Sequence, residues 1–198
     1  MATTSVDIAN LALYEAGTDT IDALTDSNER ARLCNEFYDQ SRQEVLAMTK
    51  PNWTSAMKSI HIEPDNSEPP FDYDYKFRLP DDCIRPIYPT DTNGNPWRGD
   101  WARRGNYILM NDEDCYLFYI YDLDDVKEMS PLLIQAISLQ LAWHIIPKLK
   151  QSKVRRDTIK MDLAQTLLLA EGTEGSQKAA QDPAKVRQTL KKMWVDEE

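Results

Sequence analysis

Few residues in this chain are of types that do covalent chemistry. Two histidines occur, His61 and His144, and three cysteines, Cys34, Cys83 and Cys115. A cysteine beside a histidine can act as a nucleophile with its base, so the pair to consider is Cys34 with His144. Both residues lie in stretches with apolar helical spacing, which favours a core cysteine and a histidine on a helix surface. The alternative hypothesis is a small intracellular enzyme of the Cys/His hydrolase class, with its site where the β region meets the helices.

The sequence lacks the motifs of common cofactor and metal sites. It contains no phosphate-binding glycine loop, no G-x-G-x-x-G, no H-E-x-x-H and no Cys-x-x-Cys pair. Asp81 and Asp82 follow Pro80 at the end of an expected strand, where aspartates usually form turns. The acidic run 111–114 lacks the glycine and the final glutamate of a calcium loop, so it predicts a hairpin turn. We expect no catalytic residue, no cofactor and no metal.

The chain is acidic, and it contains enough hydrophobic residues to form a core. The 198 residues carry a formal net charge of −10, and 41% of them are hydrophobic. Surplus acid disfavours a DNA-binding protein, because gripping phosphates takes clusters of Lys and Arg. The acid keeps a protein soluble, and it could also line a passage through which DNA slides without sticking. No apolar run reaches the roughly 18 to 20 residues of a membrane span, no signal peptide is expected, and three scattered cysteines predict a reducing interior.

Apolar residues at helical spacing predict four main helices. Ser5 is expected to cap the first, and Asp26 with Glu29 resembles a capping box for the second. Ser130 followed by Pro131 is typical of a helix start and opens the third. The predicted helices cover residues 6–16, 28–49, 131–147 and 152–171.

In the helical region, polar residues indicate which positions face solvent and where a linker is expected. Arg42 is placed on the exposed, charged face of the second helix. Gly172 is expected to end the fourth helix, with a small, polar linker over 172–183 after it. Asp182 and Pro183 can then start a short last helix.

Residues 54–128 have the texture of strands and loops. The most distinctive part is 71–87, where charged residues alternate with Tyr73, Tyr75, Phe77 and Leu79. That alternation is typical of a half-buried strand, and Pro80 stops it. Further strands are expected at 59–62, 83–87, 107–109 and 116–121, with a turn over 91–99. The strand at 116–121 is apolar on both faces, which predicts a central place in its sheet.

Basic residues gather in two places, as solvated helix faces or as contacts to an acidic partner. The first cluster is Lys148, Lys150, Lys153, Arg155 and Arg156. The second is Lys185, Arg187, Lys191 and Lys192, interleaved with the apolar Val186, Leu190, Met193 and Trp194. Tryptophan is a common interface anchor, so this C-terminal segment is expected to dock on a neighbour or on its own domain. Trp53, Trp97 and Trp101 bracket the β region and are expected in packing, although the latter two could instead face a partner.

The order of these elements resembles the head-to-tail adaptor proteins of short-tailed, T7-like bacteriophages, also called tail tubular protein A. Two helices lead to Pro51-Asn52-Trp53, and the run Tyr73-Asp74-Tyr75 continues through Leu79-Pro80-Asp81-Asp82-Cys83-Ile84-Arg85. A Tyr107-Ile108 strand, a strand with Leu117, Tyr119 and Tyr121, and a helix ending in Leu139-Gln140-Leu141-Ala142-Trp143 follow. The resemblance covers roughly residues 5–172, and residues 173–198 have no counterpart in the family pattern.

The resemblance implies a structural virion protein at the head–tail junction, assembled in the host cytoplasm, and not an enzyme. About twelve copies would form a ring under the portal protein and join it to the tail nozzle protein, with tail fibres as a further possible partner. Genomic DNA would pass through the ring without specific binding. The expected partner-binding residues of the C-terminal segment are Val186, Leu190, Lys191, Lys192, Met193 and Trp194.

The expected fold is α+β: an antiparallel helical bundle of about four helices with an inserted small antiparallel β region and an extended C-terminal tail. The bundle would comprise residues 1–53 and 129–172. The β region would cover 54–128, and the docking tail 173–198.

Overall fold

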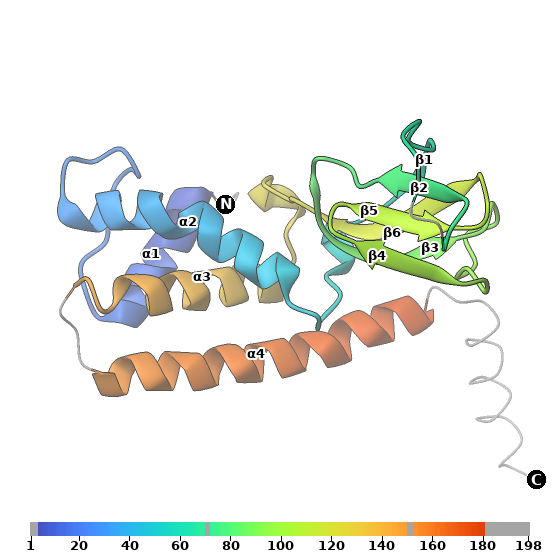
Figure 1. Cartoon of the computed structure of the whole chain (residues 1–198). Coiled ribbons are helices and arrows are strands. Elements are labelled where there is room, and N and C mark those ends of the chain that lie inside the picture. The colour runs from blue at the N-terminus through green and yellow to red at the C-terminus, as the bar shows by residue number, and fades with distance from the viewer. Residues whose placement is uncertain (1–3, 70–71, 150–152, 181–198) are drawn as a thin grey trace, which may run out of the picture. The chain divides into compact units, whose positions relative to one another are not determined.

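The chain forms two compact units, residues 1–55 together with 125–198, and residues 56–124. The structure is a computed structural model that describes residues 4–69, 72–149 and 153–180 (Figure 1). The first unit is helical and the second is made of strands. The chain is therefore α+β, as the sequence predicts.

The helical unit is built around its third helix. Its main helices are α1 (Ser5–Ala16), α2 (Glu29–Ala47), α3 (Pro131–Ile145) and α4 (Lys153–Ala180), with a short 3-10 turn at Val126–Glu128. Helix α3 packs against each of the other three, while α1 and α2 touch each other little. Figure 1 shows α3 lying between α2 and α4. The unit therefore has one central helix and three that cover it.

The prediction of an antiparallel helical bundle is wrong. In a bundle each helix buries one apolar stripe and exposes the opposite side. Instead every residue from Ala136 to Ala142 is buried, polar Ser138 and Gln140 among them. A helix that is buried on all sides needs neighbours all round, which the packing on α3 provides.

Two of the three predicted N-cap residues are wrong. Thr4, not Ser5, caps α1 and forms a capping box with Asp7. Asn28, not Asp26, caps α2, and its side chain accepts a hydrogen bond from the backbone N–H of Ala31 at 2.9 Å. Each correction is a shift of one or two residues between side chains that are all good N-caps. Ser130 caps α3 as predicted.

The prediction that the fourth helix ends at Gly172 is wrong. Helix α4 continues to Ala180, so the expected linker over 172–183 is helical in its first part. A glycine inside a helix costs about 1 kcal/mol but does not by itself stop it, and the helix formers Ala170, Glu171 and Glu174 lie close to this one. Of the expected tail, 181–198 lies outside the described residues.

The β unit consists of two three-stranded antiparallel sheets. Its strands are β1 (Met57–Ile62), β2 (Tyr75–Arg78), β3 (Cys83–Thr90), β4 (Trp101–Arg104), β5 (Tyr107–Met110) and β6 (Cys115–Tyr121). Their orders are β1-β6-β3 and β2-β5-β4. Strand β6 is central in its sheet, which confirms the prediction from its apolar run. A short 3-10 turn, Thr54–Ala56, precedes β1.

One apolar core joins the strands of the β unit. Its buried members are Phe77, Leu79, Ile108, Met110, Cys115, Leu117 and Tyr119. Phe77 and Leu79 come from the alternating stretch, whose buried face is thereby confirmed. Trp97 and Trp101 pack against this core and are half-buried, as expected for packing residues. Trp53 belongs to the helical unit, where it is buried and donates a hydrogen bond to the carbonyl of Val45 at 3.2 Å.

Candidate interaction surface

Two helices of the helical unit expose large apolar side chains. On α1 these are Leu11 and Tyr14, which are 46% and 74% exposed. On α4 they are Met161, Leu168 and Leu169, which are 66%, 70% and 58% exposed. Single exposed apolar residues are common on proteins, but repeated ones on the outer side of a helix mark interaction sites.

The pattern of α4 explains why these side chains point outward. Its buried residues are Ile159, Leu163, Thr166 and Ala170, which recur at helical spacing along one side. At 100° per residue, Met161 and Leu168 fall on the opposite side of the helix. Helix α4 therefore carries two apolar faces, and its own unit covers only one of them.

A groove lies between α4, α1 and α3. It has a volume of about 250 Å³ and is lined by Glu15, Gln135, Leu139, Asp162, Gln165, Thr166 and Leu169. These residues come from α1, α3 and α4. Leu169 and Leu139 give the groove an apolar part. Of its two acidic side chains, Glu15 pairs with Arg155 at 4.0 Å.

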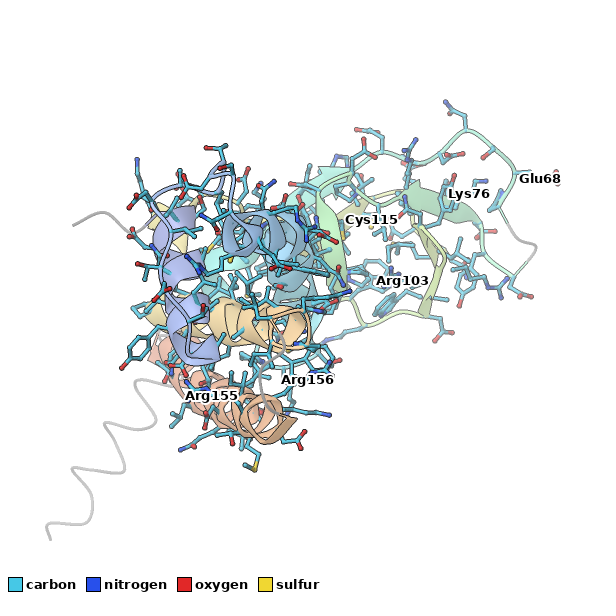
Figure 2. The ribbon with its side chains drawn as sticks, turned by 90° about the vertical axis from the view of Figure 1, so that its left-hand side faces the viewer. Glu68, Lys76, Arg103, Cys115, Arg155 and Arg156 are labelled. Carbon is cyan, nitrogen blue, oxygen red and sulfur yellow. The ribbon has the colours of Figure 1, made fainter. Side chains whose placement is uncertain are left out.

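Arg155 and Arg156 anchor the start of α4 rather than forming a free basic face (Figure 2). Arg155 donates hydrogen bonds to the carbonyls of Glu15 and Tyr14. Those carbonyls end α1, where the helix dipole favours a cation. The guanidinium of Arg156 lies 4.0 Å from the ring centre of Trp143, a cation–π contact. The side chains of Lys150 and Lys153 lie outside the described residues.

A polar cluster that sequence reasoning missed joins α2 to α3. The Glu44 carboxylate lies 2.7 Å from His144 Nε2 and accepts hydrogen bonds from Gln140 and, at 2.8 Å, from Gln40. The ring of Phe37 stacks on that of His144 with 5.5 Å between centroids. In the sequence, Gln40 to Glu44 and Gln140 to His144 are each four residues apart, which hints at paired helix faces but not at which helices meet.

Hydrogen bonding decides the charge of Glu44. Partial burial works to raise the pKa of this carboxyl group. The hydrogen bonds from His144, Gln40 and Gln140, with the charge of His144, outweigh burial and bring the pKa below its ordinary value. The cluster is thus a fixed carboxylate–imidazole pair inside a helix contact.

The cysteines do not have the properties of nucleophiles. Burial raises the pKa of Cys34 to about 11, and that of Cys115 to about 12. Burial also raises the pKa of Cys83 to about 11, against the lowering effect of Arg103. The hydrogen-bond partners of His144 are Glu44 and Gln140, so the structure does not assemble the Cys34–His144 pair.

The aspartates that follow Pro80 link parts of the β unit. Asp81 forms an ion pair with Arg78 at 3.1 Å. Asp82 accepts a hydrogen bond from the Tyr119 hydroxyl at 3.1 Å and pairs with Lys58 at 3.2 Å. Across the described residues, no group of three His, Cys, Asp or Glu side chains could hold a metal ion.

A second groove, on the β unit, is already balanced in charge. Its volume is about 400 Å³, and it is lined by Glu68, Pro69, Lys76, Arg104, Tyr107 and Leu109. Two of these residues, Glu68 and Lys76, are labelled in Figure 2. Lys76 pairs with Asp65 at 3.8 Å, and Arg104 pairs with Asp72 at 3.1 Å. Because both cations have acidic partners, we do not assign it an anion.

The residues predicted to bind partners lie outside the described part of the chain. They are Val186, Leu190, Lys191, Lys192, Met193 and Trp194. None of the helices that the structure describes combines the length and the apolar character that crossing a membrane takes. In comparisons with known proteins, no protein-family model matches the sequence, and no curated protein matches it.

Proposed function

We propose that this chain is a structural virion protein, a head-to-tail adaptor of a short-tailed bacteriophage. About twelve copies form a ring that joins the portal protein to the tail nozzle protein at the head–tail junction. The proposal starts from the ordered resemblance of residues 5–172 to such adaptors. Its site in the virion implies assembly in the host cytoplasm, with tail fibres as further partners.

The observation that carries the proposal is the presence of apolar outer faces on two different helices, α1 and α4. A ring closes through heterologous contacts, in which one surface of a subunit meets a different surface of the next. Leu11 and Tyr14 supply apolar area on α1, and Met161 supplies it on α4. Pairing such faces between copies removes both from water, which favours association by about 25 cal/mol per Å².

The charge of the chain suits the passage of DNA. A net charge of −10 repels phosphate groups, so a bore lined by such subunits lets DNA slide without binding it. In the assembled tail, Val186, Leu190, Met193 and Trp194 contact the portal or an adjacent subunit, with Lys191 and Lys192 beside them. Deleting residues 183–198 should therefore weaken attachment, and attachment at full strength would contradict this role.

Light scattering behind a sizing column tests the ring. The chain is run alone and mixed with the portal protein encoded beside it, and a co-eluting complex with one copy per portal subunit is expected. Met161→Glu should lower the number of copies bound per portal, because it places a charge in the apolar contact between copies. The matched control is Lys160→Gln, at an exposed neighbouring position of the same helix. The absence of any complex between two folded proteins would overturn the proposal.

A further inference from the structure

Strand β1 is an open edge of the β unit. It is hydrogen-bonded to β6 along Met57–Ile62, and its other side has no backbone partner among the residues that the structure describes. Residues 58–61 are all exposed, Ile60 by 43%. Alternate residues of an edge strand direct their N–H and C=O groups outward, so this edge is a template for a further strand.

Other edges of the two sheets carry features that block such pairing, and β1 does not. Strand β3, at the opposite edge of the same sheet, contains Pro86 and Pro89 and two shifts of register. The outer edge of β2 is partly covered, because Pro64 bridges to Phe77. Proline, irregular register and cover all protect an edge. Strand β1 contains no proline or glycine and keeps an unbroken register with β6.

The second open edge belongs to β4, on the opposite side of the β unit. The chain after β1 reaches β2 through the bridge between Pro64 and Phe77, whereas before β4 the N–H of Trp97 donates to the carbonyl of Pro89 on β3 at 2.8 Å. Strands β1 and β2 therefore share one side of the unit, and β3 and β4 share the other. Figure 1 shows β1 and β2 apart from β4 in this way. Edges on opposite sides suit a heterologous contact, in which each copy meets two neighbours.

The charges at these two edges are complementary. Where β1 ends, Glu63 and Asp114 lie 3.5 and 3.4 Å from the ring nitrogens of His61, and their side chains are 84% and 61% exposed. One imidazole thus lies between two exposed carboxylates. On β4, Arg103 is exposed and donates to the carbonyl of Gly105 at 3.2 Å, but it forms no ion pair within the described part of the chain. Its guanidinium is the group that binds carboxylates best.

The same charges disfavour the two symmetric pairings. Two β4 strands side by side would bring Arg103 and Arg104 of both copies together, and like charges across a strand pair are destabilising. Two β1 strands would leave the carboxylates of Glu63 and Asp114 without a new cation, because Lys58 already pairs with Asp82. Only β1 with β4 joins two open edges of opposite charge.

We propose that β1 of one copy pairs with β4 of a second copy, which places Arg103 of the second copy beside Glu63 and Asp114 of the first. The partner at the β1 edge is therefore this same chain. The inference deepens the proposed ring and rests on it for the number of copies, while the strand contact itself needs no portal. A strand as short as Trp101–Arg104 gives a weak contact in a single pair, and ring closure strengthens it because every copy makes it twice.

Charge reversal tests the contact in the full-length chain without the portal. The mass measured by light scattering should rise above that of a monomer as the concentration increases. Glu63→Arg and Arg103→Glu should each lower the association constant about tenfold, because each places like charges together. The two substitutions combined should restore most of the association. The matched control is Glu36→Arg, the same charge change at an exposed position of α2, which should leave association unchanged.

Two results would overturn the proposal. One is a chain that stays monomeric at every concentration. The other is single reversals that associate as well as Glu36→Arg does.

Hydrogen–deuterium exchange locates the contact. Between low and high concentration, the amides of 57–62 should gain protection in the natural chain but not in Arg103→Glu, while those of 83–90 should not change. No gain at 57–62 in a chain that associates would also overturn the proposal.

These outcomes are separate from the portal test. If the chain binds the portal but both reversals are without effect, the adaptor function stands and the strand contact does not. If the double reversal restores self-association but no portal complex forms, the strand contact stands and the adaptor function does not.

Discussion

Glu44 on α2 and His144 on α3 place a carboxylate oxygen 2.7 Å from imidazole Nε2, across one hundred residues of sequence. This contact ties the N-terminal helices to the helix that follows the β unit. Gln40 and Gln140 donate further hydrogen bonds to the same carboxylate. The pair is therefore a polar contact that stabilises the packing of α2 on α3. Its loss should lower the free energy of unfolding.

Replacing the carboxylate tests the contribution of this contact to stability. Glu44→Gln keeps the shape of the side chain but removes the charge that strengthens three hydrogen bonds. We expect the free energy of unfolding in urea at pH 7 to fall by about 1 kcal/mol. Glu36→Gln, on the exposed side of the same helix and paired with Arg32, should change it by less than about 0.5 kcal/mol. Equal effects of the two substitutions would contradict a special role for Glu44.

The same carboxylate predicts how stability depends on pH. Its pKa is lower in the folded chain than its ordinary value of 4.5, so folding favours the ionised form. Its contribution is complete above the ordinary value and is lost as the pH falls through the folded value. Urea unfolding at several pH values should therefore show the natural chain and Glu44→Gln converging below about pH 4.5. A difference that stays constant from pH 7 to acid would argue against this linkage.

Tyr119 and Asp82 form the corresponding polar contact inside the β unit. Tyr119 is 2% exposed, and burial with the nearby Asp82 charge raises the pKa of its hydroxyl to about 12. Tyr119→Phe removes the donor while Lys58 still pairs with Asp82, so a loss of about 1 kcal/mol is expected. Tyr116→Phe on the same strand is the control and should cost clearly less, because its ring contact with His61 is kept. Thermal unfolding of both variants makes the comparison.

The raised pKa values of the cysteine thiols predict that they react slowly with thiol reagents. With pKa values of about 11 and 12, Cys34 and Cys115 hold almost no thiolate at pH 8. In the folded chain a disulfide reagent should therefore react slowly with half-buried Cys83 and hardly at all with the other two. All three should react in denaturant. Rapid reaction of Cys34 in the folded chain, absent in Cys34→Ala, would support the hydrolase hypothesis.

Local patterns in the sequence predicted several features of the fold correctly. The alternation through Phe77 and Leu79 predicted the strand and its buried face, and Pro80 its end. Helix α1 ends at Ala16, as predicted, and Gly17 follows it with a positive φ of 74°, which glycine adopts without strain. Such features depend on residues within one or two turns, so they can be read without knowing the tertiary structure.

The same local rules could have placed Arg42 correctly. It is one helical turn from both Tyr38 and Leu46, which belong to the apolar face, so helix geometry puts it at the edge of that face. In the structure Arg42 is 4% exposed and its guanidinium lies 3.4 Å from Asp39. The prediction of an exposed position was wrong because it followed the charge of the residue rather than its place on the helix.

What the sequence determined by itself is the succession of elements: two helices, a region of strands, then two helices, with an acidic surplus and few reactive residues. Only the tertiary structure decided that α3 is central, that Glu44 meets His144, and that α4 keeps an uncovered face. The physical reason is that periodicity and capping act within a few residues, whereas packing selects partners among faces far apart in the chain. An apolar stripe indicates that a helix packs against another element, and the tertiary fold determines which element that is.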